Sequence, residues 1–388
     1  MSTIRFINAR LVCPATGVRD GELLVEGGVI ARPAATAGVR SIDCGGRLLA
    51  PGIVDLGAFA IDPAACRAGG ITRVITMPGA TGGSSPALRV HRLAHALAGG
   101  DLAEMAAARA GGAVGVATGR GWIGDSGLMR RVLAYAGALG LPLVTHAEDG
   151  GLTSDAVATD GATATRLGLP SAPAIAEAMA VMRDLFLAEA TGARIHIRQV
   201  TTAAALDIVR HAKRAGAPVT CGITPAHLFL SDIALTDFRT FAKISPPLRS
   251  EADRQACLAA VADGTIDVIA SGHDPRGPED KRLPFVEAEA GAAGAETLLA
   301  LALGLVRDGL LTLDRLFALL AANPARIAGV RAGTLEPGMP ADLIIVDDGA
   351  PWVVDANRPA GHAGNTPFDG LPVQGRVLQL FKDGRLAA

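Results

Sequence analysis

Apolar residues follow two different patterns along this chain of 388 residues. Near both ends, short apolar runs alternate with glycine-rich turns, a pattern that predicts strands. These runs are Thr3–Ala9, Gly21–Glu26, Val29–Arg32, Ala341–Asp347 and Gly375–Leu380, and the last is followed by the hairpin turn signal Lys382-Asp383-Gly384-Arg385. Because the ends of a compact chain often lie close together, we expect residues 1–50 and 333–388 to form one small β-sandwich.

The middle of the chain, residues 51–332, alternates short apolar runs with longer segments of helical period. The clearest strand candidates are Ile71–Met77, Ala113–Ala117, Leu141–His146, Arg194–Val200, Pro218–Ile223 and Ile266–Ser271. The helix candidates are Leu88–Ala98, Ala174–Thr191, Thr202–Ala215, Glu251–Asp263 and Gly294–Asp308. This alternation predicts an α/β fold, a (β/α)8 TIM-type barrel, whose functional residues should lie at the carboxyl ends of the strands.

Composition and charge exclude several classes of partner. Thirty-six basic and 38 acidic residues give a formal charge of −2, which offers no basic surface for nucleic acid. No run of about eighteen apolar residues occurs, and the start of the chain at Met1 lacks the pattern of a secretory signal, so we expect a cytoplasmic protein without a membrane span. The odd number of widely spaced cysteines favours core positions over disulfides or a thiolate zinc site.

A series of short motifs, in order and spread over nearly the whole chain, resembles the long dihydroorotases of the amidohydrolase superfamily. The motifs are Leu49-Ala50-Pro51-Gly52-Ile53-Val54-Asp55, Ala68-Gly69-Gly70-Ile71-Thr72, Met77-Pro78, His146-Ala147-Glu148-Asp149, Arg183-Asp184, Pro246-Pro247-Leu248-Arg249, Asp263-Gly264-Thr265-Ile266-Asp267, Asn323-Pro324-Ala325 and Asn365-Thr366-Pro367-Phe368-Asp369-Gly370. The resemblance implies a metal-bearing barrel with a β-sandwich built from both termini. It also implies the reversible ring closure of carbamoyl aspartate to dihydroorotate.

The family's metal-binding and substrate-binding positions are changed in this sequence. The segment Asp-x-His-x-His-x-Arg of the family aligns on Asp55–Ile61, where Gly57 and Phe59 replace the two histidines and Ile61 replaces the arginine that grips the substrate carboxylate. The asparagine expected after Met77-Pro78 is Gly79, and the one expected before Pro246 is Ser245. Isoleucine has no hydrogen-bond donor, so the carboxylate clamp is missing.

The remaining ligand positions are changed as well. Two further histidines of the family would align near Ala180 and at Gln199, and the aspartate that acts as ligand and general base aligns on Gly272, in Ser271-Gly272-His273-Asp274-Pro275-Arg276. Only Asp149 remains of the aligned ligands, and a catalytic zinc ion needs about three. The sequence therefore predicts a remnant pocket without a reaction centre, at Gly57, Phe59, Ile61, Gly79, His146, Asp149, Ala180, Gln199, Ser245, Gly272, His273 and Arg276.

A metal site rebuilt from other residues is a less favoured alternative. His146, Asp149, His196, His273 and Asp274 are all at or near the ends of predicted strands. A metal ion demands ligands placed within a few tenths of an ångström and supported by further hydrogen bonds. We therefore favour core or supporting roles for His146 and His196. Neighbouring residues of a strand point to opposite sides, so we do not expect His273 and Asp274 to act as an acid–base pair.

Two hypotheses follow for the function. The first is a non-catalytic dihydroorotase-like protein of de novo pyrimidine biosynthesis, without a cofactor. The resemblance implies for such a protein a structural role with the aspartate transcarbamoylase catalytic chain, and self-association is the other option for a partner. The second hypothesis is an active dihydroorotase or related cyclic-amide hydrolase with an atypical zinc site, which the retained Asp149 favours.

Overall fold

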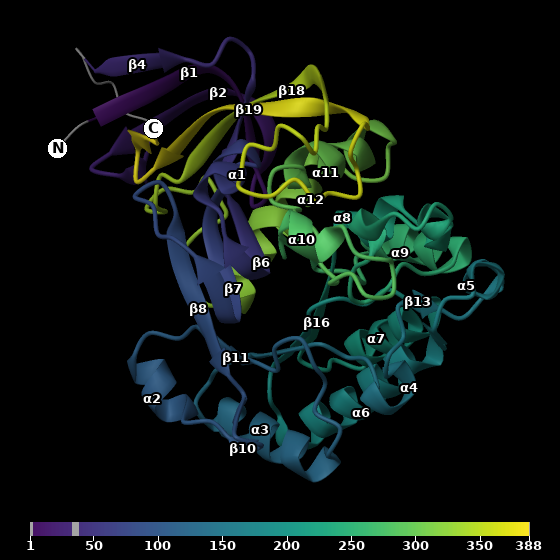
Figure 1. Cartoon of the computed structure of the whole chain (residues 1–388). Coiled ribbons are helices and arrows are strands. Elements are labelled where there is room, and N and C mark those ends of the chain that lie inside the picture. Colours follow the sequence, from purple (N-terminus) through teal and green to yellow (C-terminus); the bar gives the residue numbers. More distant parts are fainter. Residues whose placement is uncertain (1–2, 33–38, 388) are drawn as a thin grey trace.

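The computed structural model describes residues 3–32 and 39–387. Met1 and Ser2, with which the sequence opens, lie outside the described residues. Two sheets of eight strands organise the chain, one built from its middle and one from its two ends (Figure 1).

The middle of the chain forms a nearly closed barrel of parallel strands. In the order of the barrel they are β6 (Ile53–Ile61), β7 (Ile71–Gly82), β8 (Arg89–His95), β11 (Gly115–Ala117), β12 (Leu143–Thr145), β15 (Ile195–Ile197), β16 (Val219–Ile223) and β17 (Val268–Ile269). Side-chain and main-chain contacts join the first strand to the last. Phe59 N–H donates to the His273 carbonyl at 2.9 Å, and Asp55, which is buried, accepts from the Ser271 N–H at 2.8 Å. The (β/α)8 fold is therefore confirmed.

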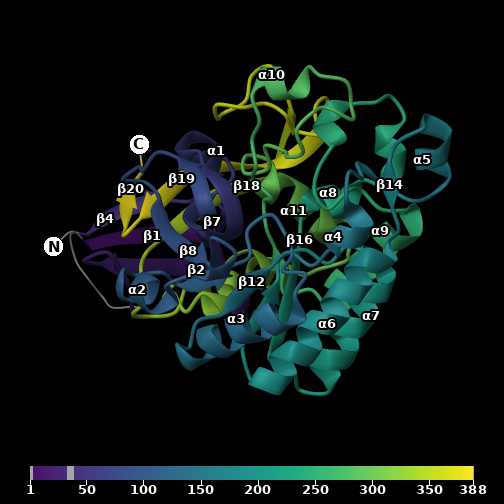
Figure 2. The ribbon, with the colours of Figure 1, turned by 60° about the horizontal axis from the view of Figure 1, so that its bottom comes forward.

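Helices surround the barrel, and α6 packs between α3 and α7 on its outer side (Figure 2). The helices are α1 (Pro63–Ala68), α2 (Met105–Ala110), α3 (Ser126–Ala138), α4 (Gly150–Thr153), α5 (Ala162–Leu167), α6 (Ile175–Thr191), α7 (Ala203–Arg214), α8 (Pro225–Phe229), α9 (Glu251–Asp263), α10 (Pro278–Lys281), α11 (Leu298–Arg307), α12 (Leu313–Phe317) and α13 (Asn323–Ile327). Short 3-10 turns lie at Asp232–Leu235 and Thr240–Ala242, and a π-helical turn at Ala318–Ala322. No helix of the described residues is long and apolar enough to cross a membrane.

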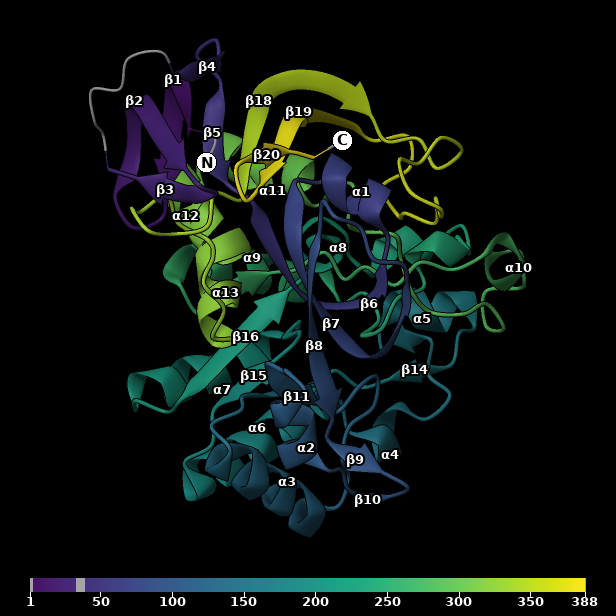
Figure 3. The same cartoon turned by 90° about the vertical axis from the view of Figure 1, so that its left-hand side faces the viewer.

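Strands from the two ends of the chain pair in the second sheet (Figure 3). They are β1 (Thr3–Cys13), β2 (Gly17–Glu26), β3 (Val29–Ala31), β4 (Arg40–Asp43), β5 (Leu48–Pro51), β18 (Leu343–Val353), β19 (Pro372–Lys382) and β20 (Arg385–Leu386). β5 joins the two ends, because it pairs with β1 on one side and with β18 on the other. The rings of Phe6 and Phe381 meet edge to face at 5.0 Å in the buried cluster of this sheet. The expected union of the termini is thus confirmed.

Short two-stranded ribbons complete the fold. β9 (Leu97–Ala98) pairs with β10 (Asp101–Leu102), and β13 (Ala158–Thr159) pairs with β14 (Ser171–Ala172). The predicted hairpin at the carboxyl end is present, since β19 and β20 are antiparallel and Asp383 and Gly384 between them have φ angles of 47° and 72°.

The helix predicted at Leu88–Ala98 is wrong. Residues Arg89–His95 form β8, which is paired with β7 on one side and β11 on the other. Leu93 and Leu97, four positions apart, suit one face of a helix, but a segment this short is ambiguous from its period alone. Hydrogen bonds to two neighbouring strands decided in favour of the strand.

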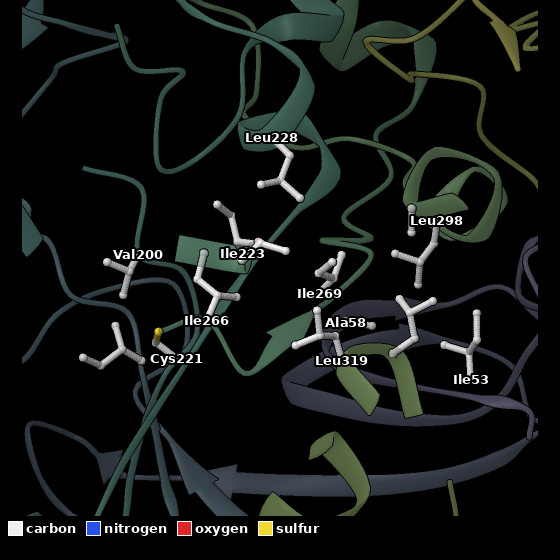
Figure 4. Packing of buried hydrophobic residues seen from close by; sticks show 14 of the residues in the cluster. Ile53, Ala58, Val200, Cys221, Ile223, Leu228, Ile266, Ile269, Leu298 and Leu319 are labelled. Atoms are coloured by element: carbon white, nitrogen blue, oxygen red, sulfur yellow. The ribbon is translucent and has the colours of Figure 1, made fainter. Parts of the chain in front are cut away.

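Apolar side chains from the strands and the surrounding helices form a continuous core (Figure 4). Ile53 of β6, Ile223 of β16 and Leu298 of α11 all belong to it, although they are far apart in the sequence. All five cysteines are buried and free, as expected of core residues. This packing holds the carboxyl ends of the barrel strands in place, and the candidate site is built on those ends.

Candidate functional site

A cavity of about 250 Å³ opens at the carboxyl ends of the barrel strands. We call it the mouth cavity. Its charged and polar lining includes Arg120, Arg198, Gln199, Ser271, Asp274 and Arg276. A second cavity of about 220 Å³ adjoins it and shares four lining residues with it, among them Arg120 and Ser245. The site therefore lies where (β/α)8 proteins carry their functional residues.

Arg198 occupies the space next to the first altered histidine position. Gly57, on β6, has a φ of +97°, and a Cβ atom added there would lie 3.2 Å from Cδ of Arg198. The ring of Phe59, at the second altered position, faces the guanidinium groups of Arg120 at 4.0 Å and Arg198 at 5.0 Å. Cation–π attraction stabilises such contacts. Two of the expected ligand positions are thus filled by an arginine stem and a phenyl ring.

The position of the expected general base is also closed. Gly272 has a φ of +61°, and a Cβ atom there would approach Cγ2 of Thr224 to 2.8 Å. A carboxylate side chain could enter this position only if Thr224 moved. Gln199, at a third altered position, lines the cavity, and its buried Oε1 atom has no hydrogen-bond partner.

A salt bridge crosses the opening of the mouth cavity. Both terminal nitrogens of Arg120, in the loop after β11, donate to the carboxylate of Asp274, which follows β17 on the other side of the opening; Nη2 does so at 2.7 Å. Arg276 Nη2 donates to the same carboxylate at 3.1 Å. His273 has other surroundings: its Nδ1 accepts from the Ala295 N–H at 3.3 Å, and burial lowers its pKa to about 4.

Arg198 is buried, with 6% of its surface exposed, and its hydrogen bonding is incomplete. Its Nη2 atom lies 3.3 Å from Nδ1 of His146, while its Nε atom has no hydrogen-bond partner. Burial lowers the pKa of the guanidinium to about 10, so the group still carries its charge at neutral pH. His146 Nε2 lies 3.2 Å from Glu148. His146 therefore links the two charged groups, with one ring nitrogen facing Arg198 and the other facing Glu148.

Behind the mouth cavity lies a buried ionic network formed by His146, Glu148, Glu177 and Arg249. Arg249 Nη2 donates to Glu148 at 2.5 Å and to Glu177 at 3.3 Å. Glu177 also accepts from the N–H groups of Thr201 and Thr202, each at 2.8 Å. Two motifs far apart in the sequence, His146-Ala147-Glu148-Asp149 and Pro246-Pro247-Leu248-Arg249, are thereby joined, so their charged residues brace the barrel.

Opposing effects set the pKa values in the network and beside it. Burial by itself would raise the pKa of Glu148, but the hydrogen bond from His146 and the charge of Arg249 outweigh it and lower the pKa to about 2. For Asp184, which pairs with Arg183, burial prevails and raises the pKa to about 6.

Several expected pocket residues do not line either cavity, so the expected pocket is corrected at these positions. Asp149 accepts from the Gly151 N–H at 2.8 Å and caps α4. Ala180 is fully buried inside α6, Ile61 packs in the core, and Gly79 lies in the exposed end of β7. The mouth cavity does bring together Phe59, Gln199, Ser245, Gly272 and Arg276, and His146 lines the adjoining cavity.

The residues at the barrel mouth do not fit the zinc ion that the fold family implies. His196 Nδ1 is bonded to Thr220 Oγ1 at 2.9 Å, Asp149 caps a helix and Asp274 is bonded to two arginines, so the residues considered for a rebuilt site are each engaged elsewhere. Residues 3–32 and 39–387 include no group of three or more His, Cys, Asp or Glu side chains that could hold a metal ion. The buried Arg198 cation would also repel one.

Sequence reasoning missed the residues that now define the site. Arg120, Arg198, Thr224 and Ala226 line the mouth cavity, although none was expected there. Arg120, Thr224 and Ala226 follow the ends of predicted strands, and Arg198 lies near the end of the strand predicted at Arg194–Val200; this was the available signal. A search limited to aligned ligand positions could not find them, because new side chains had filled the space.

The fold agrees with the comparisons with known proteins. The chain belongs to the amidohydrolase family, whose model matches residues 68–387. Its relatives place it among the dihydroorotase-like proteins. It is 38% identical to the dihydroorotase of Anaeromyxobacter dehalogenans, over 100% of this chain and 98% of that protein. It is 36% identical to the dihydroorotase of Desulforapulum autotrophicum, over 99% of this chain and 98% of that protein.

Solved structures show the same architecture. The L-hydantoinase (dihydropyrimidinase) of Arthrobacter aurescens superposes with a TM-score of 0.88 at 25% identity, covering 100% of this chain and 96% of that one. The dihydropyrimidinase of Brevibacillus agri superposes with a TM-score of 0.86 at 19% identity, over 99% and 94% of the two chains, a likeness of fold alone.

Proposed function

We propose that this chain is a non-catalytic dihydroorotase-like protein that serves pyrimidine biosynthesis as a structural partner of the aspartate transcarbamoylase catalytic chain. The observation that carries the proposal is the refilling of the reaction centre. Arg198 lies against Gly57, the ring of Phe59 contacts two guanidinium groups, and Thr224 closes the space at Gly272. Forming or hydrolysing a cyclic amide needs a polarised carbonyl and an activated water, which the family obtains from its metal.

The two buried carboxylates at the barrel mouth, Asp274 and Glu148, do not replace the missing general base. Asp274, a carboxylate in the lining of the mouth cavity, accepts hydrogen bonds from Arg120 and Arg276, so its oxygens are already engaged. Glu148 is bound to Arg249 and His146. A general base must reach the proton it removes, and these carboxylates are held by cations instead.

The outer surface of α6 supports a role in protein binding. Four large apolar side chains form a stripe along it with the spacing of one helix face: Ile175, Met179, Met182 and Phe186, which are 51%, 50%, 45% and 64% exposed. We call this the α6 stripe. It borders an apolar groove between α6 and α7. Exposed apolar surface of this extent is typical of protein contact sites, and we assign it to the transcarbamoylase contact.

The catalytic part of the proposal is tested by zinc content and turnover. Protein purified without chelator should hold less than about half an equivalent of zinc, because a catalytic zinc ion needs about three ligands. It should not interconvert carbamoyl aspartate and dihydroorotate. Stoichiometric zinc together with turnover that Asp149→Ala abolishes would contradict the proposal.

The partner is tested by mixing the two proteins in size-exclusion chromatography with light scattering. We expect a stable complex, and each protein should melt at a higher temperature in the presence of the other. The double variant Met182→Ser, Phe186→Ser should weaken the complex at least about tenfold, since central apolar anchors dominate binding energy. Leu378→Ser, on β19 and 47% exposed, is the matched control and should bind normally. Independent elution at micromolar concentrations would remove the partner proposal; an oligomer of this chain alone would point to self-association.

The second candidate is an active dihydroorotase or related cyclic-amide hydrolase with an atypical metal site. The full-length match to proteins named dihydroorotase favours it. The turnover assay separates the two candidates. Activity that rises with added zinc would support the second candidate, whereas a stable transcarbamoylase complex without turnover would support the first.

A further inference from the structure

A groove of about 640 Å³ lies between α6 and α7 on the outer side of the barrel, beside the α6 stripe (Figure 2). We call it the α6–α7 groove. One face of each helix lines it: Met182, Leu185, Phe186 and Glu189 from α6, and Asp207, Ile208, His211, Ala212 and Ala215 from α7. The members of each set are adjacent or three to four positions from the next, so each set shares one side of its helix. The two sides together form a continuous concave surface.

The floor of the groove is apolar. Leu185 is 8% exposed, and Ile208 and Ala212 are partly buried against the barrel core. The turn after α7 adds four residues without long side chains, namely Ala215, Gly216, Ala217 and Pro218. A groove of this size and lining has room for a row of apolar side chains from a partner.

The main chain of the groove walls limits the kind of partner that fits. The walls are helical, so their main-chain groups are hydrogen-bonded within α6 and α7. In the turn after α7, the N–H groups of Gly216 and Ala217 donate to Lys213 and Ala212. An extended peptide laid in the groove would bury its own N–H and C=O groups without partners, whereas a helix satisfies its main chain internally. The walls therefore favour a helix over a strand.

The charge of the groove is negative. Among the described residues that line it are two carboxylates, Glu189 and Asp207, and no lysine or arginine. Asp207 pairs with Arg210, but this arginine also pairs with Asp263. Glu189 forms no ion pair within the described chain and lies in the last turn of α6, which holds no basic residue. The partial negative charge of this helix end adds to that of Glu189, so the groove is complementary to a positive charge.

We infer that the α6–α7 groove binds an amphipathic helix of a partner protein, with apolar side chains on the groove floor and a lysine or arginine beside Glu189. We take this helix to belong to the transcarbamoylase catalytic chain, which rests on the proposed function. Met182 and Phe186 belong both to the α6 stripe and to the lining of the groove. The helix in the groove therefore continues the contact that the stripe makes.

The test is fluorescence anisotropy on the full chain with three labelled synthetic peptides, each about four helical turns long. The lysine peptide has leucines along one face and lysines on the other. The glutamate peptide replaces each lysine by glutamate, and the scrambled peptide keeps the composition of the lysine peptide but spreads the leucines around the helix. The lysine peptide should bind, and the other two should bind at least about tenfold more weakly. Equal binding of the scrambled peptide would overturn the apolar fit, and equal or tighter binding of the glutamate peptide would overturn the charge assignment.

A reversal of charge tests the role of Glu189. Glu189→Lys should weaken binding of the lysine peptide by about fivefold or more and strengthen binding of the glutamate peptide. Glu104→Lys, which reverses an exposed charge at the start of α2, is the matched control and should bind both peptides like the wild type. The same change of affinity in both variants would overturn the pairing with Glu189.

A bulky side chain tests the groove itself. Ala215 is exposed, follows the last residue of α7 and lines the groove. Ala215→Trp fills the space without removing apolar surface, so it should weaken binding of the lysine peptide at least about tenfold. Ala110→Trp, at an exposed alanine that ends α2, is its control and should bind normally. Unchanged binding by Ala215→Trp would overturn the groove as the binding site.

The same variants separate this inference from the proposed function. If transcarbamoylase forms its complex but the lysine peptide does not bind, the groove assignment alone is overturned. If the peptide binds while transcarbamoylase elutes independently, the groove site is supported and the proposed partner is removed. A dimer of this chain that Ala215→Trp abolishes would show that a second copy occupies the groove, and would overturn the inference.

Discussion

The mouth cavity and the buried ionic network lie side by side and use the same kinds of residue, but they differ in how completely their polar groups are hydrogen-bonded. In the network, Arg249 donates hydrogen bonds to Glu148 and Glu177, and Glu177 also accepts hydrogen bonds from two backbone N–H groups. In the cavity, Arg198 has an Nε atom without a partner, and Gln199 has a free Oε1 atom. His146 joins the two regions.

The difference shows which buried polar groups the fold itself depends on. A charged group that holds elements together cannot be removed without leaving its buried partner uncompensated. A group that only served chemistry in the cavity is free to change, because the space can be filled again. Three of the network residues, His146, Glu148 and Arg249, belong to the family-like motifs, whereas Gly57, Phe59 and Gly272 lie around the cavity.

The largest effect should come from breaking the network. Arg249→Met leaves two buried carboxylates without their cation and should lower the free energy of unfolding by about 3–5 kcal/mol, measured by urea denaturation. Arg131→Met, whose ion pair with Asp101 is exposed, should stay within about 0.5 kcal/mol of the wild type. A cost below about 1 kcal/mol for Arg249→Met would mean that the network does not brace the fold.

The network should also make stability depend on acid pH. The pKa of Glu148 is about 2 in the fold and has an ordinary value of 4.5, so its contribution is complete above pH 4.5 and is lost as pH falls toward 2. The loss should reach up to about 3 kcal/mol. Asp184 acts in the opposite direction, since its pKa is raised to about 6. The free energy of unfolding, measured by urea denaturation, should fall as the pH is lowered from 5 to 2.5, and Glu148→Gln should weaken this pH dependence. An unchanged pH dependence in the variant would contradict the lowered pKa of Glu148.

A smaller effect on stability is expected at Gly57, where the Arg198 side chain occupies the neighbouring space. Gly57→Ala places a Cβ atom 3.2 Å from the Arg198 stem at a φ of +97° and should cost about 2 kcal/mol in thermal or urea unfolding. Gly121→Ala, at the same end of the barrel with open space around it, is the control and should cost far less. Gly57→His should show the same loss without gain of zinc, because the other ligand positions stay empty. Stability equal to the wild type would show that Arg198 does not hold this space.

The smallest effect on stability should come from replacing Arg198. Replacing a poorly paired buried cation by an apolar side chain of similar length is often neutral, so Arg198→Met should change the free energy of unfolding by no more than about 1 kcal/mol. The same substitution at Arg249 is its matched comparison. Equal losses at the two positions would remove the distinction between cavity and network.

The sequence by itself determined the fold and the residues that stand in the family-like motifs. The alternation of apolar runs predicted most of the barrel strands, and the long helices α6, α7 and α9 lie within one residue of their predicted bounds. The altered positions Gly57, Phe59 and Gly272 were readable because they stand inside ordered motifs. These features depend on local spacing, which a sequence records directly.

Only the tertiary structure decided what fills the site. The segment Arg89–His95 is a strand because β7 and β11 lie on either side of it. Arg120 and Asp274 are 154 positions apart, and Glu148 and Arg249 are 101 apart. Such pairs form only when the barrel closes and brings the ends of different strands together. Whether a buried charged group finds a partner therefore depends on how all the strand ends are arranged in space. No local sequence pattern contains this information.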